Sequence, residues 1–343
     1  MSNARKLADN LPTEGSLSNR NVLINGEMNM SQRGTSFASL TSGYAYTLDR
    51  FARYIHLAGT WTMSQSTDTP TGQGFANSLK VDCTTARTSL DAATELVVLQ
   101  RIEGQNLQRL KKGTANAEKV TLSFWVKSAK TGTYIAELFD STNSRHISKS
   151  YTISAANTWE KKELTFDGDT TGALANTNAS AIQLNFWLSN GSNWQSGTLQ
   201  TSWGANTQAN RAVGQVNLAD STSNDWYLTA VQLEVGPQST PFEHRSYADE
   251  LARCQRYYAA WSSSGLTDNL YMYTPYASGT PPNTSASVGY TFPVTMRANP
   301  TMVGVGLSLN RFTSSIHNAV AQMSSTVSNA AYSLASWTAD AEL

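Results

Sequence analysis

The sequence predicts a mainly β protein, in which an antiparallel β-sandwich is followed by one helix and a smaller C-terminal β-sandwich. Apolar and polar residues alternate in many runs of about eight to twelve residues, and Gly, Asn, Asp, Ser and Thr separate these runs, as is typical of antiparallel sandwiches. Only one segment, residues 247–258, has the spacing of a convincing helix. At 343 residues the chain exceeds what one core usually organises, so we expect more than one domain.

The first 20 residues are polar and bury too little to fold alone. Leu7 and Leu11 lie at a helical spacing, and Pro12 would end any helix there. We expect residues 1–20 to form an N-terminal docking segment held by a partner surface. Folding back onto its own domain is the open alternative.

Residues 21–240 are expected to form the main domain. A first group of strand runs lies at 60–64, 78–81 and 96–102, and the polar piece QNLQRLKKG fits one helical turn. The clearest strand runs follow: KVTLSFWVKS, GTYIAELFD, HISKSYTIS, NTWEKKELTFDG, AIQLNFWLS and DWYLTAVQLEVG.

Residues 241–258 are predicted to be a linker and a helix. Ser246, followed three residues later by Asp249, fits a capping-box start. Spacings of four, three and four then place one set of apolar residues on a single helix face: Tyr247, Leu251, Cys254 and Tyr258.

Residues 259–343 are predicted to form the smaller sandwich. VGYTFPVTMRANPTMVGVG contains two strands broken at a turn, and AAYSLASWTADAEL is a closing strand. Few charges occur after Ala259: Asp268, Arg297, Arg311, Asp340 and Glu342. We expect much of this surface to be buried between copies, although a monomeric sandwich coated with Ser and Thr remains the alternative.

Composition argues against several classes of partner. The 25 basic and 25 acidic residues cancel, so the footprint that neutralises phosphates in nucleic-acid binding is missing from the sequence. No run of about 18 apolar residues occurs, which argues against membrane insertion. Cys83 and Cys254 are the only cysteines, and we expect two buried free thiols.

We expect no catalytic residue, no metal site and no cofactor, and therefore not an enzyme. The four histidines (His56, His146, His244 and His317) show no metal-ligand spacing such as HExxH. CxxC pairs and GxSxG elbows are also missing from the sequence. A carboxylate pair assembled by folding stays open.

Tryptophans are the best candidates for ligand binding. Side chains alternate across a strand, so if Phe124 and Phe186 face the core, Trp125 and Trp187 face outward. Asn185 shares the face of Trp187. An exposed indole wastes burial of about 150–250 Å², so a sugar, a neighbouring subunit or the chain's own loops should cover each ring. Trp194 and Trp203, in Gly/Ser/Asn-rich loops, are expected to be exposed, or else to hold their loops in place.

The runs EKVTLSFWVKSAKTGTY and TAVQLEVG resemble strands of the jelly-roll carbohydrate-binding modules found beside glycoside hydrolases. The resemblance covers roughly residues 95–236 and implies a jelly-roll sandwich. Thr229 and Ala230 stand where that family usually has an acidic residue, which puts its metal binding in doubt here.

A second resemblance spans nearly the whole chain. NRNVLINGEMNMSQRGTSF, YTLDRF, LQRIEG, VQLEVGPQSTPFEHRSYADELARCQRYY, FPVTMRANPT and WTADAEL are similar to tail-fibre and related virion proteins of marine bacteriophages. This implies a structural, non-enzymatic virion protein, assembled in the bacterial cytoplasm as a homotrimer. It would contact other virion proteins through residues 1–20 and a glycan on the host surface. A capsid fibre or decoration protein, a free glycan-binding module and, less favoured, a polysaccharide depolymerase are the alternatives.

Overall fold

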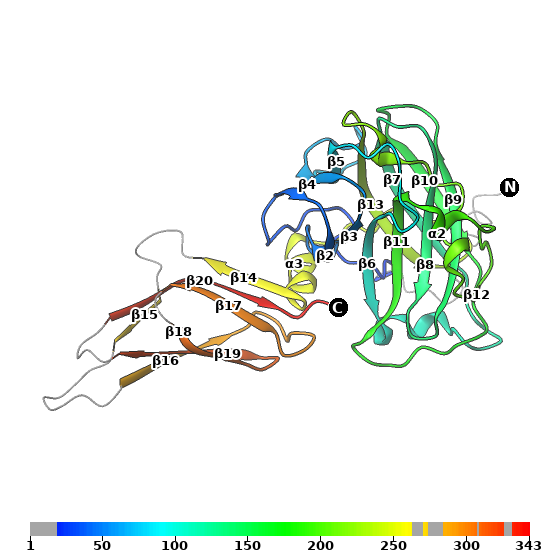
Figure 1. The fold of residues 1–343 in the computed structure, drawn as a ribbon. Coiled ribbons are helices and arrows are strands. Elements are labelled where there is room, and N and C mark those ends of the chain that lie inside the picture. Colours follow the sequence, from blue (N-terminus) through cyan, green and yellow to red (C-terminus); the bar gives the residue numbers. More distant parts are fainter. Residues whose placement is uncertain (1–18, 263–269, 274–283, 307–308, 326–330) are drawn as a thin grey trace, which may run out of the picture. The chain divides into compact units, whose positions relative to one another are not determined.

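The computed structural model describes residues 19–262, 270–273, 284–306, 309–325 and 331–343 (Figure 1). The chain divides into unit 1, Met1–Arg245 with Leu343, and unit 2, Ser246–Glu342. The boundary falls inside the expected linker and helix, so residues 241–245 cluster with unit 1 and the helix with unit 2. Of the expected docking segment 1–20, only Asn19 and Arg20 lie within the described residues.

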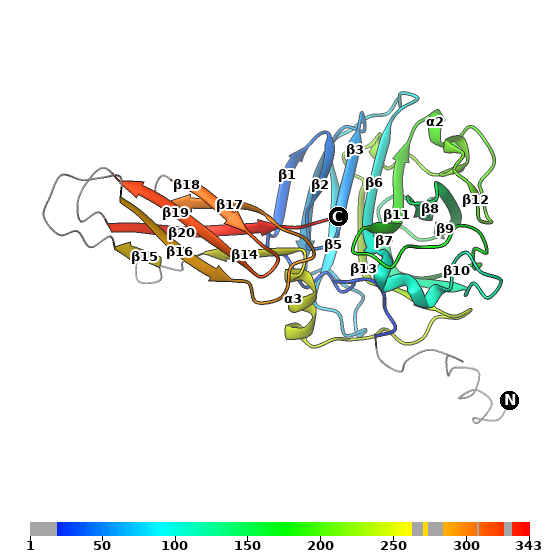
Figure 2. The same cartoon turned by 90° about the horizontal axis from the view of Figure 1, so that it is seen from below.

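Unit 1 is an antiparallel jelly-roll β-sandwich of two sheets, as predicted (Figure 2). The chain changes sheet repeatedly, because β5, β7 and β10 lie in one sheet while β6, β8 and β11 lie in the other. In spatial order, sheet A contains β1 (Ser36–Leu40), β4 (Thr60–Ser66), β5 (Ser78–Thr85), β13 (Asp225–Val235), β7 (Val120–Ser128) and β10 (Glu160–Phe166). Sheet B contains β12 (Gly204–Ala205), β9 (Arg145–Ile153), β8 (Gly132–Asp140), β11 (Ser180–Asn190), β6 (Glu95–Glu103), β3 (Ala52–His56) and β2 (Gly43–Tyr46).

The main core lies between the sheets and follows the predicted alternation. Phe124 of β7 and Phe186 of β11 are fully buried, with ring centroids 5.1 Å apart, and Trp226 of β13 packs against Phe186. The residues that share their parity belong to the same apolar cluster: Val120, Leu122, Val126, Ile182, Leu184 and Leu188. The prediction of two inward-facing Phe residues is confirmed.

Short helical turns interrupt the strands of unit 1. The predicted turn after β6 is the 3-10 helix η1 (Gly104–Leu110). The long connection between β11 and β13 holds α2 (Ser192–Gln195), η2 (Gln208–Asn210) and η3 (Leu218–Asp220). No helix in the described part of the chain is long and apolar enough to cross a membrane.

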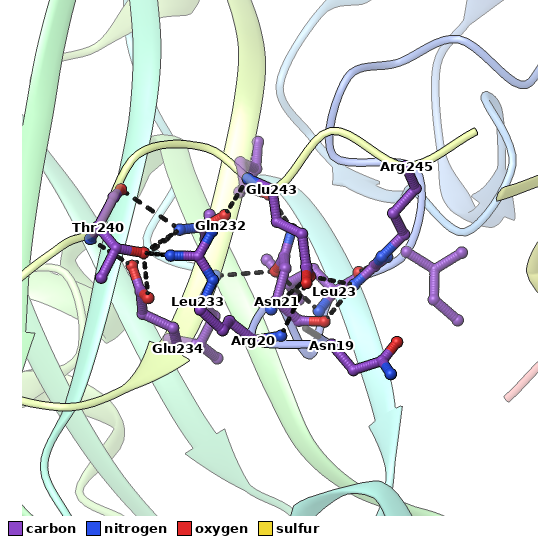
Figure 3. Close-up of polar contacts among 12 residues, drawn as sticks. Asn19, Arg20, Asn21, Leu23, Gln232, Leu233, Glu234, Thr240, Glu243 and Arg245 are labelled. Atoms are coloured by element: carbon purple, nitrogen blue, oxygen red, sulfur yellow. Dashed lines mark hydrogen bonds and ion pairs between the residues drawn. The ribbon is translucent and has the colours of Figure 1, made fainter. Parts of the chain in front are cut away.

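Polar contacts tie the first described residues to the end of unit 1 (Figure 3). The Glu243 carboxylate accepts from the backbone N–H groups of Arg20 (3.1 Å) and Asn21 (3.0 Å). The Asn21 amide donates to the Val231 carbonyl (2.9 Å) and accepts from Leu233 N–H (3.0 Å), beside a bulge in β13 where Ala230 has a φ of 54°. Two of the segments behind the phage resemblance, the one that begins at Asn19 and the one that begins at Val231, therefore meet as a structural clasp.

Unit 2 begins with helix α3 (Tyr247–Gln255), whose predicted cap is confirmed. The Ser246 hydroxyl accepts from Asp249 N–H (3.2 Å) and donates to the Asp249 carboxylate (2.7 Å). One sheet contains β14 (Tyr258–Ser262), β20 (Ala331–Asp340), β15 (Leu270–Tyr273) and β17 (Thr301–Gly306), and the other contains β16 (Thr284–Thr291), β19 (Asn318–Ser325) and β18 (Leu309–Ser314).

The described core of unit 2 is small and includes Phe292 and Trp337, whose ring centroids lie 5.8 Å apart. Cys83 in unit 1 and Cys254 in unit 2 are both free and buried, as predicted. Burial of the charge-poor surface between copies stays a prediction.

Candidate ligand-binding site on sheet B

Every second side chain of β11 points away from the core, to the outer face of sheet B. Here Asn185 pairs in register with Leu99 of β6 and Glu137 of β8. Trp187 pairs with Val97 and Ile135 in the same way. The outward direction predicted for Trp187 and Asn185 is therefore correct, because inward and outward residues alternate along the strand.

A cavity of about 200 Å³ lies on this outer face. It combines aromatic rings, amides and charged groups, and its floor comes from five neighbouring strands of sheet B. Its lining residues are Tyr44, Tyr54, Glu95, Val97, Leu99, Arg101, Phe139, Gln183, Asn185, Trp187 and Arg211. The volume falls below the roughly 300–1,000 Å³ of pockets for drug-sized ligands, so it suits one small polar unit.

A buried ion pair organises the floor of the cavity. Glu137 is fully buried and holds Arg211 through two hydrogen bonds, from Nε at 2.6 Å and Nη2 at 2.8 Å. The same carboxylate accepts from the Asn185 amide (2.8 Å) and the Trp187 indole N–H (3.1 Å). Four hydrogen-bond donors therefore hold the carboxylate in place. Because they come from three residues of the cavity floor, the same bonds hold that floor rigid.

The electrostatic consequence is an ionised glutamate in a dry site. Burial by itself would raise the pKa of Glu137, but the charge of Arg211 and the hydrogen bonds from Arg211 and Asn185 outweigh it, so the pKa lies below its ordinary value. This carboxylate is held as an anion and is not available as a proton donor at neutral pH.

The chain's own loop covers Trp187. The Arg211 guanidinium carbon lies 4.5 Å from the Phe139 ring centroid, 5.2 Å from that of Trp187 and 5.3 Å from that of Trp194. Trp187 and Trp194 are themselves 5.2 Å apart, and Trp187 is fully buried. Of the three covers considered for this ring, the chain's own loop is the one found. The expected exposure of Trp194 is wrong, because it is half-buried in this cluster.

The rim of the cavity consists of residues that sequence reasoning did not select. Tyr44 of β2 is 37% exposed, and Tyr54, Arg101 and Gln183 are half-buried. The Arg101 guanidinium carbon lies 4.4 Å from the Tyr44 ring centroid. Nothing in the sequence indicated that β3 pairs with β6, or that β2 pairs with β3, in sheet B.

Glu95 is the titratable group of the cavity. Burial, which is the largest influence, and the neighbouring Glu137 charge raise its pKa to about 7, while Arg211 lowers it. His56 is its register partner on β3. Glu95 therefore changes charge within the physiological range.

The other two predicted tryptophans lie elsewhere. Trp203 is half-buried against the main core, its indole N–H donates to the Asp167 carbonyl (2.8 Å), and the Lys112 ammonium lies 5.2 Å from its ring. It holds its loop in place, which was the alternative expected for this ring, and it is not exposed. Trp125 is half-buried on the outer face of sheet A, between Lys161 and Thr229.

No protein-family model matches the chain, and no curated protein matches it in sequence. Among solved structures it is similar to the enzymatically active domain of tailspike protein 4 of bacteriophage CBA120, with 14% identity and a TM-score of 0.32, over 63% of this chain and 21% of that chain. It is also similar to a putative sugar-binding protein of Bacteroides thetaiotaomicron, with 11% identity and a TM-score of 0.35, over 63% of this chain and 100% of that chain.

A third similar structure is a family 11 carbohydrate-binding module of Clostridium thermocellum in complex with a β-1,3-1,4-mixed-linked tetrasaccharide, with 10% identity and a TM-score of 0.30, over 60% of this chain and 99% of that chain. The chain thus spans about a fifth of the tailspike chain and nearly all of the other two. At these identities and TM-scores, the similarity bears on none of the side chains that line the cavity.

Proposed function

We propose that this chain is a non-enzymatic glycan-binding protein that uses the cavity on sheet B, and that it serves as a phage tail-fibre component contacting the host surface. The observation that best supports glycan binding is the set of side chains that line the cavity. Aromatic rings, an amide and a guanidinium converge above a rigid floor, on the outer face of a sheet whose other face fills the core.

These groups suit a sugar. A pyranose ring presents C–H groups on its faces, which pack on aromatic rings such as Tyr44 and Tyr54, and hydroxyls at its edge. Gln183 both donates and accepts, and Arg101 donates in a planar fork, so together they match hydroxyl pairs. Sites of this kind gain affinity when their side chains are held before the ligand arrives. The Glu137–Arg211 pair supplies that rigidity here.

The chemistry of the floor supports binding over hydrolysis. Glycoside hydrolysis uses two carboxyl groups, one as acid and the other as base or nucleophile. Glu137 is fully committed to Arg211, Asn185 and Trp187, so it has no role as the second carboxyl group beside Glu95.

The virion assignment is supported by the sequence resemblance to phage tail-fibre proteins. In this proposal, residues 1–20 attach the protein to the particle, copies assemble as a homotrimer, and unit 1 presents sheet B to the host.

Binding to immobilised bacterial surface oligosaccharides tests the glycan proposal. We expect the full chain to bind at least one of them, and both Tyr54→Ala and Gln183→Ala to weaken that binding about tenfold or more. Trp125→Ala is the matched control, because it truncates an aromatic residue on the outer face of sheet A. Binding to no oligosaccharide, or full affinity in both sheet B variants, would overturn the proposal.

A further inference from the structure

The charges that line the sheet B cavity are unequal. Glu95, Arg101 and Arg211 are its charged lining residues. Glu137 neutralises Arg211 through the two-pronged ion pair. Within the described part of the chain, no ion pair joins Arg101 to an Asp or Glu side chain. Arg101 instead donates to an oxygen of Leu343, so a ligand reaches this cation only by replacing that oxygen.

The surroundings of Arg101 already hold an oxygen acceptor. Its Nη1 donates to the backbone oxygen of Leu343 (2.7 Å), a residue that clusters with unit 1. The Tyr46 hydroxyl donates to the same oxygen (3.0 Å). Gln183 is the register partner of Arg101 on β11, so its amide lies on the same face. Arg101 and Tyr46 thus donate to one oxygen, and Gln183 lies beside Arg101 on the same face of sheet B.

We propose that the ligand is an acidic glycan, and that Arg101, with Tyr46 and Gln183, binds a carboxylate of one of its sugar units. The inference rests on the proposed function and narrows it to a class of sugar. A carboxylate offers two oxygens in the plane that the arginine fork matches, and the hydrogen bonds are charge-assisted. A neutral sugar hydroxyl in the same place makes fewer and weaker bonds. The ligand carboxylate would take the position of the Leu343 oxygen.

Glu95 adds a dependence on pH. The groups facing it are Arg211 from the covering loop, Glu137 from β8 and His56 from β3. With its pKa raised to about 7, Glu95 is an anion at pH 8 and largely neutral at pH 6. A sugar carboxylate, with an ordinary pKa of about 3.5, stays ionised over this range. Acidic ligands should therefore bind more tightly at pH 6 than at pH 8.

The test uses uronic-acid-containing bacterial oligosaccharides, each paired with the oligosaccharide obtained by reducing its carboxyl groups to hydroxymethyl groups. Calorimetry on the full chain should show at least one acidic member binding about tenfold more tightly than its reduced partner. Arg101→Gln should bring that ratio close to one. Lys161→Gln, which removes an exposed cation from sheet A, should leave the ratio as it is.

The outcomes separate the two proposals. Equal affinity for acidic and reduced members, or a ratio that survives Arg101→Gln, would overturn the acidic specificity and leave glycan binding in place. Binding of neither member of any pair would contradict the proposed function itself. Glu95→Gln provides a second readout, because it should abolish the change in affinity between pH 6 and pH 8.

Discussion

Glu137 and Arg211 show how one buried pair sets the geometry of a site. Taking both charges out of water is unfavourable, and the pair is stable because each charge meets the other in good geometry and the remaining carboxylate lone pairs are satisfied. Asn185 and Trp187 complete that shell from the lining of the cavity, and their direct contact with a ligand stays a prediction.

Arg211→Met should lower the free energy of unfolding of unit 1 by about 3–5 kcal/mol, because it leaves Glu137 buried without its counter-charge. Denaturant unfolding of the full chain, followed by tryptophan fluorescence, measures this loss. Glu137→Leu combined with Arg211→Met should recover most of the stability. A double variant as unstable as the single one would contradict this account of the pair.

Glu95 should make unit 1 less stable as the pH rises. Its pKa is raised from 4.5 to about 7 in the folded protein, so between these values the folded state binds more protons than the unfolded state. Stability from this group is therefore present at pH 4.5 and is lost as the pH rises through 7. Glu95→Gln should flatten this decline, which urea titrations at pH 5 and pH 8 measure. An equal decline in both proteins would exclude Glu95 as its cause.

At the scale of elements, the sequence predicted which strand residues face the core and where helix α3 begins. It did not predict which strands are neighbours in a sheet. The inward faces of β7 and β11 were predicted correctly from Phe124 and Phe186, because side chains alternate along a strand with a fixed period of two. Tyr54 and Arg101 line the same cavity because β3 pairs with β6, a contact between distant segments that no local pattern encodes. The loop that covers Trp187 has no periodic pattern of apolar residues. The burial of Trp187 and Trp194 therefore could not be predicted from the sequence either.

Helix α3 provides the clearest local test. Ser246→Ala should destabilise unit 2 by about 1 kcal/mol, because the Asp249 N–H at the helix start loses its acceptor. Ser246→Asp retains a capping oxygen and should stay within a few tenths of a kcal/mol of the original. Thermal unfolding of the three proteins gives the comparison. A Ser246→Ala protein as stable as the original would show that the cap contributes nothing.

At the scale of the whole molecule, the virion proposal makes its own prediction. Mass photometry of the purified protein should show a particle of three chains of 37.2 kDa each. Deleting residues 1–18, which keeps the contacts of Arg20 with Glu243 and Thr240, should abolish incorporation into phage particles while leaving glycan binding intact. A monomer would contradict the trimer, and normal incorporation of the truncated chain would contradict the docking role.

The central claim is that the outer face of sheet B binds the glycan. The most direct measurement is a crystal structure of the chain with an oligosaccharide that it binds in solution. We predict a sugar ring in the cavity, packed on Tyr54 and hydrogen-bonded to Gln183. A sugar bound on sheet A at Trp125, or beside Trp203, with the sheet B cavity filled only by water, would contradict the account.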